Sequence, residues 1–143
     1  MPSPNDDLVD ALVQLSFLVQ GTLAELAGEH GLSVAQARLL GVLRDREPTM
    51  NELGRHLGLD KSSTSGLVDR AEKRGLVLRT PSATDRRVVQ VSITPAGLEL
   101  VTTAAAVFAD RLGNLTAEVS DSDRRALVRA TRRILDADPG WLG

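Results

Sequence analysis

The sequence predicts a single α+β domain that is mostly helical, with six helices and one β-hairpin. Helix start and stop signals recur along the whole chain, and only residues 76–80 and 88–94 alternate like strands. The length of 143 residues suits one domain. The 42% hydrophobic content is enough for a core, and because only 2% of residues are aromatic, Leu, Val and Ala must fill it.

Each predicted helix opens on a residue whose side chain can accept hydrogen bonds from free backbone N–H groups. In chain order these caps are Asn5 or Asp6, Ser33 with Gln36, Thr49 with Glu52, Asp60, Thr94 before Pro95, and Ser120 with Asp123. The second and third have the spacing of reciprocal capping boxes. The stop signals are Gly31, Gly58, Gly75 and Pro139-Gly140.

The first and the fifth predicted helices carry long apolar stripes. The stripe of the fifth helix has heptad spacing and consists of Leu98, Val101, Ala105, Phe108, Leu112, Leu115 and Val119. The stripe of the first consists of Leu8, Leu12, Leu15, Val19, Leu23 and Leu26. These helices could cover one another within one chain. Because the stripes exceed what a small domain covers, we expect a homodimer instead.

The middle of the chain has a helix, a tight Gly-containing turn and a second helix, at 49–56, 57–59 and 60–74. This order is typical of a helix-turn-helix that reads DNA. On a helical wheel the inward face of the second helix carries Thr64, Leu67, Val68 and Ala71. The outward face carries Ser62, Gly66, Asp69 and Lys73, flanked by Ser63, Ser65 and Arg70. Taken alone, that outward face could equally belong to an ordinary solvated surface helix.

The loop of the hairpin, residues 81–87, is long and polar and ends in Asp85-Arg86-Arg87. A carboxylate can hold a neighbouring guanidinium in a bidentate orientation, which would shape the loop before a ligand arrives. An arginine held in this way suits the strongly negative minor groove of DNA. The hairpin is therefore predicted to act as a wing beside the second helix.

The charge distribution agrees with this prediction, although the chain as a whole carries a net charge of −2. Residues 60–90 contain seven basic and four acidic residues, a net +3, so the rest of the chain carries −5. Positive charge is concentrated where a negatively charged duplex would lie. The overall acidity argues against a protein that coats DNA by charge alone.

Composition also excludes several classes of protein. The absence of cysteine excludes disulfides, thiolate zinc sites and cysteine-based peroxide sensing. With only His30 and His56, and with no nucleophile elbow, phosphate loop or carboxylate constellation, we predict no catalytic, cofactor or metal site. No apolar run of eighteen residues and no signal peptide is present, so we expect no membrane span and no membrane partner, and a cytoplasmic protein.

Residues 49–97 resemble the winged helix-turn-helix core of the MarR family of bacterial transcriptional regulators. The resemblance rests on Lys61–Val77, on Asp85-Arg86-Arg87, and on the trailing Thr94-Pro95-Ala96-Gly97. It implies one domain over 1–143, with a DNA-binding lobe at about 33–97 and dimerisation helices at about 6–30 and 95–137. It also implies a small-molecule pocket between those helices and the lobe. Gly66 departs from the family pattern, in which a larger and often basic residue is usual.

The sequence therefore predicts a DNA-binding transcriptional regulator, a ligand-responsive repressor that binds a palindromic operator as a homodimer. The residues expected to contact DNA are Lys61, Ser62, Ser63, Ser65, Arg70, Lys73, Arg86 and Arg87, with Asp85 orienting the wing. A protein-interaction module that has lost DNA binding is the alternative, which the basic wing disfavours. An effector pocket that stacks planar ligands would depend on Phe17, Phe108 or Trp141, for which core packing and a C-terminal anchor are the simpler interpretations.

Overall fold

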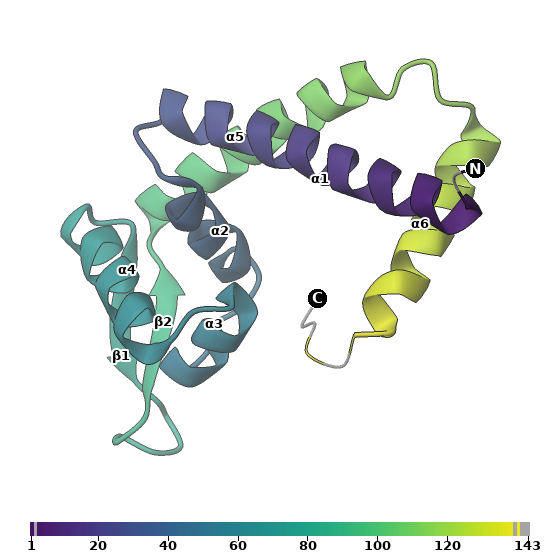
Figure 1. Cartoon of the computed structure of the whole chain (residues 1–143). Helices are drawn as coiled ribbons and strands as arrows, with labels where there is room; N and C mark the ends of the chain where they lie inside the picture. The colour runs from purple at the N-terminus through teal and green to yellow at the C-terminus, as the bar shows by residue number, and fades with distance from the viewer. Residues whose placement is uncertain (2, 139, 141–143) are drawn as a thin grey trace.

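The computed structural model describes residue 1, residues 3–138 and residue 140. Within them the chain order is α1 (Pro4–Glu29), α2 (Val34–Leu43), α3 (Met50–Leu57), α4 (Lys61–Lys73), β1 (Val77–Pro81), β2 (Val89–Ile93), α5 (Pro95–Leu115) and α6 (Asp121–Asp136). The predicted mostly helical fold with a two-stranded wing is confirmed. Figure 1 shows α2–α4 and the hairpin as one lobe, joined to the long helices α1 and α5, which pack on each other, and to α6 beyond them.

Most of the predicted helix starts are confirmed, but the start of α1 is not. The cap is Ser3 rather than Asn5 or Asp6, because Pro4 has the fixed backbone geometry of a first helical residue. The Ser3 hydroxyl accepts a hydrogen bond from the Asp6 N–H at 3.2 Å, and the Asp6 carboxylate accepts one from the Ser3 N–H at 2.9 Å. Asp6 is therefore the third residue of a capping box, and the pKa of its carboxyl is lowered by the hydrogen bond from the Ser3 backbone.

Only one of the two hydrogen bonds of the predicted capping box at α2 is formed. The Ser33 hydroxyl accepts from the Gln36 N–H at 3.1 Å, as expected. The Gln36 side chain, however, is buried and donates instead to the Leu67 carbonyl oxygen of α4 at 3.3 Å. A tertiary partner has replaced the local one. The box between Thr49 and Glu52 at α3 is complete, with both bonds between 3.1 and 3.2 Å.

The hairpin is antiparallel, and its strands begin one residue later than predicted. Val77 faces Ile93, Arg79 faces Val91, and Pro81 faces Val89. The Val91 N–H donates to the Pro48 carbonyl oxygen at 2.9 Å, so the segment before α3 holds the outer edge of β2. The predicted stop at Pro139 lies outside the described residues.

The hydrophobic core lies in the lobe. Its fully buried large side chains are Leu39, Leu40, Leu43, Leu53, Leu67, Val68, Val77 and Val91. From α1 only Leu26 and Ala27 are buried, and α6 contributes no buried residue. The long helices therefore leave most of their apolar stripes exposed in the single chain.

By length and composition alone, α1 could cross a membrane, since an 18-residue window has a mean hydropathy of 1.3. This property differs from the expectation of no membrane span, because Asp10, Gln14 and Gln20 interrupt the apolar run without lowering the mean hydropathy of the whole window below this value. Only 11% of the window is buried within the chain. A helix that is enclosed by other helices has the same composition.

Hydrogen bonds hold the start of α5 next to the residues that precede β1. The Thr94 hydroxyl caps α5 and donates to the Gly75 carbonyl oxygen at 2.6 Å, while its N–H donates to the Leu76 carbonyl oxygen at 3.0 Å. Gly97 lies one turn further on, where a Cβ atom would collide with the Leu76 carbonyl oxygen and come within 2.8 Å of Ile93 Cγ1. Only glycine allows this close approach between α5 and the lobe.

Replacing Gly97 with Ala should therefore lower the free energy of unfolding by about 1–3 kcal/mol through overpacking. The matched control is Gly113→Ala, also inside α5, where an added Cβ meets nothing within 4 Å. That change should raise the free energy of unfolding by about 0.5–1 kcal/mol, because glycine inside a helix is unfavourable. Urea titrations of both variants measure the difference. Equal effects at the two positions would contradict the proposed close approach.

Candidate nucleic-acid interface

Helices α3 and α4 form a helix-turn-helix whose turn is built on Gly58. Gly58 has a φ of +65° and ψ of 33°, a left-handed conformation that ends α3 and that glycine adopts without steric strain. Leu59 then donates its N–H to the Gly54 carbonyl oxygen at 2.9 Å. Asp60 opens α4 by accepting a hydrogen bond from the Ser63 N–H at 2.7 Å, which lowers the pKa of its exposed carboxyl.

The inward face of α4 is the one that the helical wheel predicted. Thr64, Leu67, Val68 and Ala71 are all at most 2% exposed. The Thr64 hydroxyl donates to the Asp60 carbonyl oxygen at 2.7 Å, which satisfies its only polar group. Because this face is buried, the rotation of α4 about its axis is fixed, and the opposite face is exposed to solvent.

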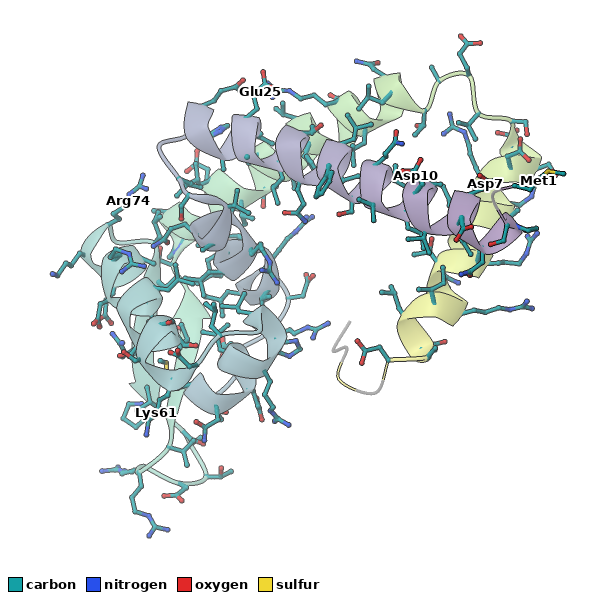
Figure 2. The ribbon with its side chains drawn as sticks, viewed as in Figure 1. Met1, Asp7, Asp10, Glu25, Lys61 and Arg74 are labelled. Carbon is teal, nitrogen blue, oxygen red and sulfur yellow. The ribbon has the colours of Figure 1, made fainter. Side chains whose placement is uncertain are left out.

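Several residues expected to contact DNA are exposed along α4. Lys61, Ser62 and Ser63 form its first turn, and Arg70 and Lys73 lie further along. Figure 2 shows Lys61 and Arg74 at opposite ends of this helix. A Cβ on Gly66 would lie 3.4 Å from Arg70 Nη1, so the Arg70 guanidinium extends back over the glycine. The position where the family usually carries a larger residue is thus bordered by a cation from the next turn.

Ser65 is placed differently from the other predicted residues. It is half-buried, and both its carbonyl oxygen and its hydroxyl accept hydrogen bonds from Arg79 Nη2, at 3.2 and 3.4 Å. It therefore faces the wing rather than the open surface of α4. Sequence reasoning counted Arg79 only as a charge. The signal that could have singled it out is the pair Asp69 and Glu72, three residues apart on the adjoining helix.

The wing loop contains an ion pair between Asp85 and Arg87. Arg87 donates from Nε to one carboxylate oxygen at 3.2 Å and from Nη2 to the other at 3.3 Å. The Arg87 N–H also donates to this carboxylate at 3.0 Å, and the Val88 N–H closes the turn on the Asp85 carbonyl oxygen. The Arg87 side-chain hydrogen bonds are the main reason that the pKa of Asp85 is lowered. Arg86 is exposed and forms no ion pair with another described residue.

Two of the basic residues make contacts to other elements of the protein, and the other five are left on the outer surface of α4 and the wing. Of the seven basic residues in 60–90, Arg79 pairs with Asp69 and Glu72, and Arg74 donates to the Gly31 carbonyl oxygen at 2.8 Å. The remaining basic residues are Lys61, Arg70, Lys73, Arg86 and Arg87, the same five cations that were predicted to contact DNA. Positive charge on the first turn and outer face of α4 and at the wing is the arrangement that contacts a phosphate backbone.

The two histidines lie apart and take part in local contacts. His30 Nδ1 lies 3.0 Å from the Leu26 carbonyl oxygen at the end of α1, and His56 Nε2 lies 3.4 Å from Arg46 Nη1. Among residues 1, 3–138 and 140, no group of three or more His, Cys, Asp and Glu residues could hold a metal ion.

An apolar cavity of about 150 Å³ lies where α1, α2 and α5 meet. It is lined by Leu23, Leu26, Ala27, His30, Leu32, Ala37, Leu40, Gly41, Val101, Ala104, Ala105 and Phe108. Phe108 is half-buried at this cavity. Phe17 is 71% exposed, so its expected core packing is wrong for the single chain, because its side of α1 has no intrachain neighbour to cover it. Trp141 lies outside the described residues.

Comparison with known proteins supports the resemblance to regulators. A family model described as the MarR family matches residues 30–88. A MarR-family transcriptional regulator from Rhodococcus sp. RHA1 is 25% identical, with a TM-score of 0.81, and the match covers 99% of this chain and 100% of that one. The MepR–DNA complex of S. aureus has the same fold, at 18% identity and a TM-score of 0.76, over 91% of this chain and 97% of that one.

A curated relative, described as a putative transcriptional regulatory protein for the hcr operon of Thauera aromatica, is 28% identical over 82 residues. This match covers 57% of the present chain and 49% of the relative's own length.

The fold and the surface together define a winged helix-turn-helix protein. Residues 30–88 match the MarR family model, and the chain as a whole has the fold of a MarR-family transcriptional regulator. This similarity to transcriptional regulators agrees with the prediction that the chain is not an enzyme.

Proposed function

We propose that this protein binds a palindromic duplex DNA as a homodimer and represses transcription from it. The observation that carries the proposal is the placement of positive charge on the lobe. Five cations, Lys61, Arg70, Lys73, Arg86 and Arg87, are exposed on α4 and the wing, and the ion pair with Asp85 leaves the Arg87 side chain 91% exposed. In this arrangement the first turn of α4 enters the major groove and the wing, which extends beyond α4 in Figure 1, reaches the minor groove.

The second copy in the proposed dimer would cover the apolar residues of the long helices. In α6, Leu127, Val128 and Ile134 are between 48 and 50% exposed, and this helix makes no extensive contact with the rest of the described chain. An isolated amphipathic helix of this length is marginally stable in water, so α6 needs a surface to pack on. The exposed apolar residues of α1 in a second chain, such as Leu8, Leu12 and Leu15, would supply one.

An effector for this regulator would be small and largely apolar. The cavity between α1, α2 and α5 has an almost wholly apolar lining, and His30 carries its only ionisable side chain. Such a lining favours neutral, hydrophobic molecules over charged ones, because burying a charge without a partner is costly.

Repression of genes inside the cell requires a cytoplasmic protein, which matches the localisation expected from the sequence.

The first test is selection of a duplex from a random DNA pool by the wild-type protein, followed by titration at several salt concentrations. A dimer that neutralises about six to ten phosphates should give a log–log slope of about −5 to −9. A selected duplex with two-fold symmetry and a steep slope is the expected result. A flat salt response, with no sequence enriched, would favour the protein-interaction module instead.

The wing makes a separate prediction about three neighbouring residues. Arg86→Ala and Arg87→Ala should each weaken binding to the selected duplex by about 1–3 kcal/mol, because each removes a phosphate or groove contact. Asp85→Ala should also weaken binding, since it leaves both cations in place but frees Arg87 from its fixed orientation. Titration of one labelled duplex with the three variants compares them. Tighter binding by Asp85→Ala would mean that its carboxylate only repels the duplex.

The dimer is tested by sedimentation equilibrium at micromolar concentration, where a mass of about twice 15.3 kDa is expected. The double variant Leu127→Gln, Ile134→Gln should raise the dimer dissociation constant at least about tenfold, or about 1.4 kcal/mol, because both side chains lose an apolar partner. The matched control, Arg125→Gln with Arg132→Gln, changes positions with the same spacing on the opposite face of α6. A wild-type mass near 15.3 kDa would refute the dimer.

A further inference from the structure

A cluster of charged side chains joins α4, the proposed recognition helix, to the wing. From β1, Arg79 Nη1 contacts Asp69 Oδ1 at 2.7 Å and Glu72 Oε1 at 3.2 Å. Arg79 Nη2 donates to the Ser65 carbonyl oxygen and hydroxyl at 3.2 and 3.4 Å. Ser65, Asp69 and Glu72 are spaced i, i+4 and i+7, so they form one stripe along α4. The Arg79 guanidinium therefore spans two turns of the recognition helix.

The same cluster holds the backbone of the wing. Arg79 faces Val91 in the register, and the Arg79 N–H does not bond to β2 but donates to Glu72 Oε2 at 3.1 Å. On the other edge of the hairpin, the Val91 N–H donates to the Pro48 carbonyl oxygen. Backbone bonds thus fix both edges of the hairpin, one of them through a carboxylate of α4. This contact joins the backbone of β1 directly to α4.

The exposure of these side chains separates them from the DNA-contacting cations. The Arg79 side chain is only 25% exposed, and both of its terminal nitrogens already donate to protein acceptors. Asp69, by contrast, is 55% exposed on the outward side of α4, where its charge opposes phosphate. Two carboxylates on a helix proposed to read DNA are unfavourable by simple electrostatics, and both of them contact Arg79 instead.

We propose that Asp69 and Glu72 act as positioning residues, which hold Arg79 and so fix the wing at one angle to the recognition helix. The cluster then determines sequence specificity more than affinity: α4 and the wing reach their two grooves together only when their angle matches the duplex. This inference rests on the proposed DNA binding and goes beyond it, because it assigns a role to three charged residues outside the contacting set.

The double variant Asp69→Asn, Glu72→Gln tests the proposal, because positioning and simple electrostatics predict opposite signs. Removing two negative charges beside phosphate should tighten binding to every duplex if electrostatics alone matters. If the cluster positions the wing, binding to a scrambled duplex tightens while binding to the selected duplex weakens. The ratio of the two affinities should then fall at least about tenfold. An unchanged ratio would overturn the proposal.

Two comparisons keep that test selective. Asp45 is an exposed residue of the same lobe, and its carboxylate makes no ion pair with another described residue. Asp45→Asn should therefore leave the ratio of the affinities for the selected and the scrambled duplex unchanged. Arg79→Lys keeps the charge but cannot reach all four acceptors, so its ratio should fall as well. A normal ratio for Arg79→Lys would show that charge, and not geometry, is what Arg79 supplies, and would overturn the proposal.

Hydrogen exchange on the unbound protein supplies a readout without DNA. Glu72→Gln should accelerate exchange at the Arg79 amide and its hairpin neighbours while α2 amides keep their wild-type rates. Unchanged exchange in the hairpin would overturn the positioning role. If the wild-type protein enriches no duplex, the proposed function fails, and the exchange result still decides whether the cluster fixes the wing. If the wild type binds a selected duplex and the double variant keeps its ratio, only the present inference fails.

Discussion

The buried face of α4 is the constraint on which the rest of the structure depends. Leu67, Val68 and Ala71 are almost completely enclosed, so α4 cannot rotate without exposing them. At about 25 cal/mol per Å² of apolar surface, exposing two such aliphatic side chains costs several kcal/mol. That cost fixes which residues of α4 face outward. The buried apolar residues thus determine which polar and charged side chains of α4 are exposed to solvent.

The charges of the lobe are arranged around that fixed helix. The chain has a net charge of −2, but its charges are not evenly distributed. Some acids pair with a cation that is largely enclosed by the protein, and other cations are left exposed. Asp85 differs from the other paired acids, because the side chain of its partner Arg87 is 91% exposed. The ion pair restricts the direction of this guanidinium without burying it, so the entropy lost on binding is reduced beforehand.

Local signals predicted the fold well, and tertiary contacts explain where they failed. The caps at Thr49, Asp60 and Thr94 and the inward face of α4 follow from neighbouring residues alone, so the sequence predicted them. Ser3 was missed because Asn5 and Asp6 also have good capping chemistry, and the choice depended on Pro4. Gln36 was misassigned because its amide prefers a carbonyl thirty-one residues away.

The candidate site shows the same limit. The five exposed cations could be predicted because their positions on α4 and in the loop follow from helix periodicity and turn chemistry. The roles of Ser65 and Arg79 could not, because they depend on how β1 lies against α4, and no spacing in the sequence encodes that angle. Phe17 is exposed because no other element of the described chain packs on its side of α1, and helix periodicity alone could not show this.

The end of α1 connects the apolar cavity to the recognition helix. Glu29 forms an ion pair with Arg111 of α5 at 2.8 Å, and the Gly31 carbonyl oxygen accepts from Arg74 at the end of α4. His30 and Leu32, the neighbours of Gly31, line the cavity. Within four residues, Glu29 to Leu32, this short connection therefore contacts α5, the cavity and α4. The long helices and the lobe are thus joined at this point by direct contacts between side chains and backbone, as well as by the chain itself.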